Sequence, residues 1–466
     1  MLARLSSAPG LPVEEPTAPY WMDEAPFGEL ADVQDEIPPV ADVVIIGSGM
    51  TGVAVAKHIL EQSTLSVTVL EARQLCSGAT ARNGGHIKPP PFADFSRLRA
   101  QLGERSARKV VACQLRHLPV LLALGAEHPL GEVREVDTLD VFVDEEDFQA
   151  VRREVVALRE WMPEVEVEVV AGEEARCRFG LKEHIVGAVA YKAGALFPFR
   201  LVTSLWHGLA ERYADRLRLR THSPVTAVWP TLDAAYPLCC RLHNTITTTT
   251  TTTTHNNTTT TTTIAARHIV HATNAFAPHL VPALRSCLTG ALGHMTSQRA
   301  SPPMLSPRTS CSIFYGPDMY DYATHRAAHD LIGGGLFCSR AHGLDQFGIW
   351  DDSCLDYRSL AHLHGSLAAV YGPRSVAVSR AWSGIMAFTG DGLPLVGGVP
   401  GRRGEWVAAG YCGDGMVWAW LCGAALASML LGAAEGIEDW FPVKEVAITE
   451  ARLGRANLRH LVEQLV

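Results

Sequence analysis

The sequence predicts an α/β fold of two domains, organised around a Rossmann-like nucleotide-binding unit. Three observations predict it. Residues 43–46 form a continuous apolar, β-branched run, which is typical of a parallel strand buried on both faces. A glycine-rich turn follows at once, and a helical pattern begins on top of it. A second apolar run, 65–70, ends in Glu71.

The glycines of this turn have separate physical roles. Gly47 gives the backbone the freedom to turn, Gly49 lets a phosphate approach the main chain, and Gly52 lets the helix pack closely on the sheet. The N–H groups at the helix start, with the helix dipole, form a seat for a pyrophosphate. Glu71 can accept hydrogen bonds from both ribose hydroxyls of an adenosine, and it would repel a 2′-phosphate. The predicted dinucleotide-binding residues here are Gly47, Ser48, Gly49, Met50, Thr51, Gly52, Glu71, Ala72 and Arg73.

A second loop of small and polar residues follows, and it is too polar for a core. It consists of Ser77, Gly78, Ala79 and Thr80, and then Arg82, Asn83, Gly84, Gly85 and His86. With this loop the chain resembles the D-amino-acid oxidase superfamily of FAD enzymes, which includes glycine and sarcosine oxidases. It looks most like the branch of γ-glutamylputrescine oxidase-like and fungal oxidoreductases. The resemblance implies FAD as the cofactor, with this loop wrapped around its pyrophosphate and isoalloxazine.

Later segments carry further signatures of the same family, so the resemblance extends from about Tyr20 to Trp440. It implies a Rossmann-like FAD-binding domain interleaved with a substrate domain built on a mostly antiparallel sheet. After an N-terminal extended arm at 1–40, the FAD-binding domain is expected to comprise 41–90, 196–290 with a Thr-rich loop insertion at 245–263, and 379–466 including the C-terminal tail. The substrate domain is expected to comprise 91–195 and 291–378. The implied additional FAD contacts are Val225, Ala272, Thr273, Asn274, Gly384, Asp391, Gly413, Gly415 and Met416.

The individual elements follow in chain order. The proline-rich, acidic residues 1–40 predict a surface arm anchored by Tyr20 and Trp21. Periodicity predicts helices over 95–124, 144–161 and 201–213, and strands over 132–142, 165–170, 217–220 and 264–272. The threonine tract at 245–263 has no hydrophobic period, so we expect a surface loop without chemistry. The apolar run 416–432 is at the short limit for a bilayer, and a buried helix is the better interpretation.

Composition restricts the partners and the compartment. A net charge of −9 argues against nucleic acid or an anionic membrane as a partner. Eleven scattered cysteines, without zinc spacing, indicate reduced thiols and no metal site. The N-terminus shows no apolar signal region, so a cytoplasmic location is expected, with peroxisome and mitochondrion left open.

The chemistry that the resemblance implies is removal of a hydride from a carbon that bears an amine. The product is an imine, and O2 or another acceptor reoxidises the flavin. Met386 stands where glycine-oxidase-like relatives have an arginine for the substrate carboxylate, so a primary or secondary amine is favoured over an α-amino acid. No cysteine occurs between Cys354 and Cys412, so FAD is expected to be non-covalent.

Three residues are candidates for catalysis, and each has a structural alternative. His294 can act as a base near neutral pH, although lone histidines are more often packing residues. His86 follows the Gly84–Gly85 turn and can approach the flavin face. Tyr315 lies in a strand expected to line the pocket. His294 and Lys88 are also candidates for assisting the reaction with oxygen, because no lysine occurs between Lys192 and Lys444.

Other functions stay open at this point. An FAD enzyme acting on a C–C or C–O bond of a biosynthetic intermediate is the main alternative, since a shared fold does not fix the reaction. A flavin monooxygenase would show a further nucleotide signature, and a binding protein would not need intact flavin loops.

Overall fold

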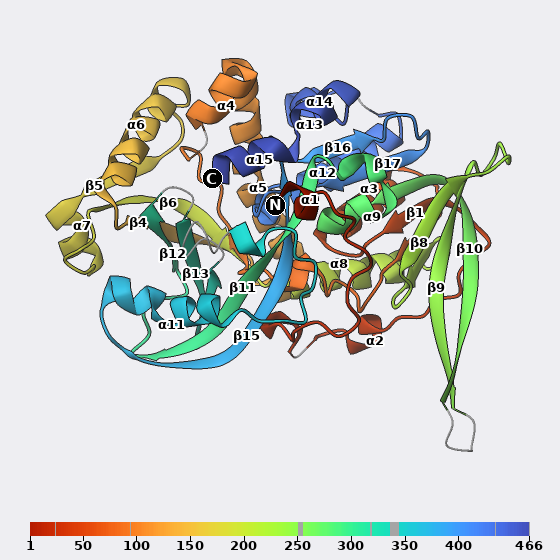
Figure 1. Cartoon of the computed structure of the whole chain (residues 1–466), viewed down its shortest axis with the longest axis horizontal. Coiled ribbons are helices and arrows are strands. Elements are labelled where there is room, and N and C mark those ends of the chain that lie inside the picture. Colours follow the sequence, from red (N-terminus) through yellow and green to blue (C-terminus); the bar gives the residue numbers. More distant parts are fainter. Residues whose placement is uncertain are drawn as a thin grey trace.

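The chain forms two sheets that share a central interface (Figure 1). A computed structural model describes residues 1–23, 25–93, 95–249, 255–316, 319–335, 344–433 and 435–465. Each sheet is assembled from segments far apart in the sequence, and this agrees with the α/β two-domain fold that the sequence predicts.

Sheet A contains the strand that leads into the glycine-rich turn, and its central strands are parallel. In the described residues its main path runs β16 (Leu395–Gly398), β17 (Glu405–Ala409), β10 (His255–His271), β1 (Val40–Ile46), β2 (Val67–Leu70) and β7 (Leu217–Arg220), with β8 (Val225–Pro230) and β9 (Leu238–Thr249) attached through β10. β1 lies between β10 and β2, parallel to both. All the residues of β1 from Val43 to Ile46 are buried, as a doubly covered strand requires.

Sheet B is mostly antiparallel. Its described strands run in the order β15 (Ser375–Thr389), β11 (Leu288–Ser301), β14 (His329–Gly334), β13 (Met319–Arg326), β12 (Thr309–Gly316), β4 (Arg134–Phe142), β6 (Gly187–Ala195) and β3 (His86–Ile87), with β5 (Val167–Ala171) also paired to β6. β12 and β4 form the one parallel pair among these strands.

The two faces of sheet B have different neighbours. One face packs on α11 (Tyr357–Tyr371), through a cluster that contains Leu139, Ile313 and Leu363. The opposite face contributes Phe142, Met295 and Trp382 to the main core, which also includes the helices of sheet A. The second face therefore looks toward the nucleotide-binding domain.

Helices cover the remaining surfaces. The main ones are α3 (Met50–Gln62), α4 (Phe95–Leu102), α5 (Glu104–Glu127), α6 (Glu145–Trp161), α7 (Gly172–Phe179), α8 (Pro198–Arg212) and α12 (Ala419–Leu430); the short ones are α1 (Leu2–Leu5), α2 (Gly28–Ala31), α9 (Ala277–Leu280), α13 (Val443–Val446), α14 (Glu450–Arg455) and α15 (Leu458–Leu465). α12 packs against α3, and Gly423 permits this because an added Cβ would lie 2.7 Å from the Cβ of Ala54.

Two of these helices, α12 and α5, are apolar enough to be considered as candidate membrane spans. α12 is buried on nearly its whole circumference, as expected for the apolar run 416–432. α5 is the one described helix long and apolar enough, by length and composition, to cross a membrane. It buries His117 against the start of α12, where the imidazole accepts the N–H of Leu421. Core helices of this kind meet the same criterion, so α5 is weak evidence for a span.

The predicted domain boundaries after residues 290 and 378 each lie inside a strand, because β11 and β15 pair from Leu288↔Thr389 to Ser301↔Ser375, with a register shift between Ser297 and Gln298. The threonine tract is not simply a loop. β9 and β10 pair through it as far as Thr249↔His255, and the hairpin projects from the body in Figure 1. The tip of the tract, 250–254, lies outside the described residues.

Parts of the N-terminal arm are buried, so it lies deeper in the protein than the predicted surface arm. Trp21 is buried and donates its indole N–H to the carbonyl of Asn83, while Tyr20 is half-buried. Leu5 is also buried, in a cluster with Phe347 and Leu458. The arm therefore joins both domains.

Candidate active site

The turn between β1 and α3 has no space for side chains at its glycines. A Cβ on Gly47 would lie 2.6 Å from the carbonyl oxygen of Ala272, and one on Gly52 would lie 2.1 Å from that of Gly47. Gly47 also has a φ of +104°, which favours glycine. Gly47 and Gly49 are half-buried, so the turn keeps some exposure beside the buried strand, whereas the first residues of α3, Met50 to Gly52, are buried. This is the cradle that a pyrophosphate requires.

Glu71, at the end of β2, is held in place by hydrogen bonds from Ser48 and Arg73. Its Oε2 accepts the N–H and hydroxyl of Ser48 at 3.0 and 2.6 Å, and its Oε1 accepts the N–H of Arg73 at 3.1 Å. A carboxylate has about four acceptor sites, so Oε1 retains capacity for a ribose hydroxyl. The half-buried position of Glu71 at the sheet edge suits that role.

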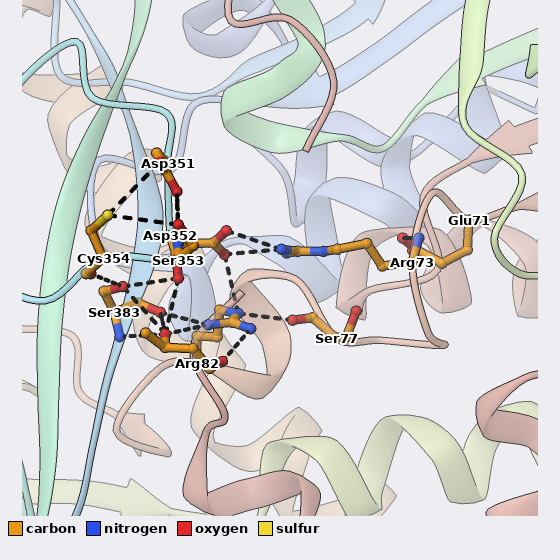
Figure 2. A network of polar contacts seen from close by, with 10 residues as sticks. Glu71, Arg73, Ser77, Arg82, Asp351, Asp352, Ser353, Cys354 and Ser383 are labelled. Atoms are coloured by element: carbon orange, nitrogen blue, oxygen red, sulfur yellow. Dashed lines mark hydrogen bonds and ion pairs between the residues drawn. The ribbon is translucent and has the colours of Figure 1, made fainter. Parts of the chain in front are cut away.

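The second loop is held by a buried network of charges (Figure 2). Arg73 donates to both carboxylate oxygens of Asp352 at 3.0 and 3.2 Å, and Nε of Arg82 lies 3.3 Å from Asp352 Oδ2. Arg82 also donates to the carbonyls of Ser77, Ser383 and Thr17. Burial lowers the pKa of Arg82 to about 10, against the opposing effect of Asp352. The network joins the loop to β15, to the arm and to the segment before α11.

The Gly84–Gly85 turn brings the loop against sheet B. The N–H of Gly84 donates to the hydroxyl of Tyr322 at 3.2 Å, and its carbonyl accepts the hydroxyl of Thr324 at 2.7 Å. An added Cβ on Gly84 would lie 2.3 Å from the Tyr322 ring, and one on Gly85 would lie 2.4 Å from the carbonyl oxygen of Leu196. Both glycines are therefore required by close approach.

A polar row on sheet B faces this loop. Asp140, Ser312 and Tyr322 are directly paired across β4, β12 and β13, so their side chains share one face. The row continues through Gly333 and Met295 to Trp382. Because Tyr322 contacts Gly84 and Trp382 donates to the carbonyl of Arg82, this face lies over the loop.

Lys88 joins the row from the chain after β3. Its ammonium group contacts both Asp140 and Ser312 and lies 5.8 Å from the centroids of two aromatic rings. Tyr191 donates its hydroxyl to Asp140 at 3.0 Å. Burial raises the pKa of Asp140, and Lys88 works in the opposite direction. Sequence reasoning missed Asp140, because a single acidic residue in a strand carries no motif.

The three predicted catalytic residues lie in different places. His86 stacks near Tyr322, with 6.1 Å between ring centroids, and its Nε2 is 2.9 Å from the hydroxyl of Ser310. Burial, aided by Lys88, lowers the pKa of His86 well below its usual value, so it is neutral at pH 7. His86 therefore belongs to the face over the loop.

His294 and Tyr315 lie on the other face of sheet B, away from the polar row. His294 precedes Met295 on β11, so it points away from the polar row, and its Nε2 accepts the N–H of Asp356 before α11. Tyr315 donates to Asp321, beside His362 of α11. Neither placement supports contact with a flavin.

Most of the remaining predicted residues fall into two groups. Ala272, Thr273 and Asn274 directly follow β10 beside Gly47, and the Asn274 side chain accepts the N–H of Gly410. Gly413 is exposed, Gly415 has no neighbour within 4 Å of an added Cβ, and Met416 is half-buried. These positions border open space.

Three other positions are placed differently. Gly384 packs on Arg82, and Val225 is buried two residues after Ser223, whose N–H donates to the carbonyl of Glu71. Asp391 is bound bidentately by Arg452 of α14 at 2.9 and 3.2 Å. Its carboxylate is thus used in a salt bridge with Arg452.

The residues present fit a bound dinucleotide. The glycine cradle is accessible, Glu71 has a remaining acceptor site, and the buried hydroxyls of Ser77 and Thr273 have no hydrogen-bond partner among the described residues. A group with many acceptors, placed along this loop, would satisfy them. Among the described residues, no three histidine, cysteine or acidic side chains are grouped as a metal site would require.

Comparison with known proteins identifies similar chains. The model of the family described as FAD dependent oxidoreductase matches residues 42–429. A bifunctional protein of tRNA 5-methylaminomethyl-2-thiouridine biosynthesis from Thiobacillus denitrificans is 57% identical over 42 residues, which is 9% of this chain and 7% of that protein. The chain thus spans only a small fraction of this curated relative.

Solved structures are similar over most of their length. Glycine oxidase from Geobacillus kaustophilus is 20% identical with a TM-score of 0.67, covering 89% of this chain and 99% of that one. L-proline dehydrogenase from P. horikoshii is 18% identical with a TM-score of 0.64, covering 88% and 98%. At these identities the likeness shows the fold.

Proposed function

The chain belongs to the family of FAD-dependent oxidoreductases, and from this membership we propose that it oxidises a primary or secondary amine to an imine, which water then hydrolyses. Bound FAD would accept the hydride from the carbon next to nitrogen and pass its electrons to O2 or another acceptor. The glycine cradle, Glu71 and the second loop would hold the cofactor without a covalent bond.

One observation supports the proposal most directly. A buried carboxylate, Asp140, lies in the polar row of sheet B that faces the second loop. An amine must lose its extra proton before its C–H bond can be oxidised, and a buried carboxylate can accept that proton. Burial raises the pKa of Asp140, which makes the carboxylate a better proton acceptor, while Lys88 opposes this shift by charge pairing and Tyr191 donates a hydrogen bond to it.

The surroundings of Met386 support an amine without an α-carboxylate. Met386 and Phe388 lie within about 4 Å of the position that a Cβ on the exposed Gly413 would take. An apolar wall at this point offers no partner to a carboxylate, whose burial without one would be costly. The two similar solved structures named above include an oxidase of glycine and a dehydrogenase of proline, so the fold accommodates C–N oxidation.

The test is an anaerobic titration of the FAD-loaded protein, following flavin absorption. Compounds that differ only in an α-carboxylate, such as butylamine and norvaline, are compared, with N-methylbutylamine as the secondary amine. Bleaching by the amines alone is expected. If dithionite reduces the flavin but neither class does, amine oxidation is wrong, and the alternative of a C–C or C–O bond in a biosynthetic intermediate takes its place.

A matched pair of variants tests the role of Asp140. Asp140→Asn should slow flavin reduction by about 100-fold or more, the usual contribution of a positioned acid or base. Asp137→Asn is the control, since Asp137 lies on the same strand but is exposed and pairs with Lys192. Equal rates for the two variants would remove Asp140 from the mechanism.

A further inference from the structure

Two apolar side chains near the end of β15, Met386 and Phe388, form a wall on the face of sheet B that lies over the second loop. Side chains alternate along a strand, so both share this face with Trp382 and Gly384, which contact Arg82. They follow Gly384 by about 7 and 13 Å along the strand. The apolar wall therefore continues the face that carries the polar row.

The wall is supported from behind by buried apolar residues. Phe347 is buried and meets Phe388 edge to face, with 5.0 Å between the ring centroids. Phe347 belongs to a cluster with Leu5 of α1 and Leu461 of α15, and both Met386 and Phe388 pack against it. The two helices lie beside each other near the centre of Figure 1. This packing holds the wall in position, so a ligand that binds there has little to reorder.

The other side of the wall faces the segment between β17 and α12. An added Cβ on Gly413 would lie 4.0 Å from both Sδ of Met386 and Cζ of Phe388. Gly413 is exposed and the two apolar side chains are half-buried, so water reaches all three. An apolar ligand that covers this wall would remove its surface from water, and that is favourable.

The same segment also lies near the polar row. The short helix η6 (Gly415–Val417) contacts β3, which leads into Lys88. Burial raises the pKa of Tyr191, and the carboxylates of Asp140 and Asp414 act in the same direction, so Asp414 lies near the row. The segment that carries Asp414 thus connects the apolar wall with the polar row. A ligand beneath this segment would meet a carboxylate at one end and apolar side chains at the other.

We propose that Met386 and Phe388 determine specificity by holding an apolar alkyl chain of the substrate, so that the enzyme acts on hydrophobic amines. This inference rests on the amine oxidation proposed above and names the substrate class. The nitrogen of the amine would face Asp140, and the alkyl chain would cover the wall. The flexible thioether of Met386 adapts to ligands of different shape, which suits an alkyl chain.

The experiment follows anaerobic flavin reduction of the FAD-loaded protein by propylamine, butylamine, pentylamine and hexylamine. Each added CH2 group that is buried against the wall should raise the second-order rate constant of reduction about fourfold. Met386→Gln keeps the length of the side chain but makes it polar, so this increase should fall to about twofold or less, whereas Met386→Leu should retain it. Met304→Gln is the matched control, because Met304 is also half-buried but packs in the cluster under α11.

A second series separates this inference from the reaction itself. Amines without a hydrogen on the carbon next to nitrogen, such as tert-butylamine and tert-pentylamine, cannot be oxidised, so calorimetry measures their binding alone. Binding that tightens with chain length in the natural protein but not in Met386→Gln would support the wall even if no amine reduces the flavin. Reduction and binding that do not depend on length, absence of both, or a length dependence that Met386→Gln leaves intact would overturn the proposal.

Discussion

Substitution of Asp352 by asparagine should destabilise the protein through the two arginines that it leaves behind. The carboxylate of Asp352 is 2% exposed, and the side chains of Arg73 and Arg82 are 9% and 3% exposed. Asparagine keeps the shape and one acceptor oxygen but removes the negative charge. Burial already lowers the pKa of Arg82 to about 10 against the effect of Asp352, so the variant removes the group that favours the charged guanidinium.

The size of the effect follows from these contacts. Breaking a buried ion pair by removing one partner costs about 3–5 kcal/mol. Arg82 keeps its bonds to the carbonyls of Ser77, Ser383 and Thr17, and this places the expected loss near the lower end, about 3 kcal/mol. That is a large fraction of a typical stability of about 5–15 kcal/mol.

Urea denaturation of the FAD-free protein, followed by tryptophan fluorescence, measures the loss. Asp351→Asn is the matched control, because Asp351 is exposed and bonds only to its neighbours Ser353 and Cys354 among the contacts described. It should change stability by less than about 0.5 kcal/mol. Equal effects of the two substitutions, or a change below about 1 kcal/mol for Asp352→Asn, would refute the reasoning.

Three further predictions concern the cofactor, catalysis and acid stability. Gly52→Ala forces a Cβ to 2.1 Å from the Gly47 carbonyl oxygen and should weaken FAD binding about tenfold or more in a fluorescence titration, whereas Gly365→Ala, in open space on α11, should not. Burial raises the pKa of Asp140, and Lys88 partly offsets this. Lys88→Met removes that offset, so the pKa of Asp140 should rise and the acidic limb of the kcat/KM profile should move to higher pH. An unchanged profile would contradict the pairing. His117 has a pKa lowered by burial from 6.5 to about 4, so its contribution to stability is complete above pH 6.5 and is lost as pH falls to 4, by about 3 kcal/mol. His117→Gln keeps an acceptor for Leu421 and should flatten the dependence of unfolding free energy on pH in that window.

The nucleotide-binding half could be predicted because its determinants are local. Gly47, Gly49 and Gly52 lie in one short turn, and Glu71 follows on the next strand. The polar partners of the second loop could not be found in this way. Asp352 meets Arg73 across 279 positions of sequence, and Asp140 meets Lys88 across 52. A single acidic residue in such a pair leaves no pattern.

The sequence does not indicate on which face of sheet B His294 lies, and this has a physical cause. β11 is buried on both faces over most of its length, so alternation of polar and apolar residues does not reveal which side a residue takes. The threonine tract was expected to be a surface loop, but much of it lies in the paired strands β9 and β10. Threonine has no hydrophobic period, but it is β-branched and favours extended backbone, and pairing along β9 and β10 satisfies that preference.

The contacts of the N-terminal arm limit the order in which parts of the molecule can fold. Thr17 bonds to Asp352 and Ser383, and α1 packs against α15 (Figure 1). The residues of the arm thus find these partners only after segments several hundred positions further along the chain have been made. Closing loops of several hundred residues is slow, so the arm must wait while both sheets form without it. Because α1 and α15 are in contact, a short linker could join these two helices, and a chain opened instead in an exposed turn would carry the arm and its partners close together in sequence.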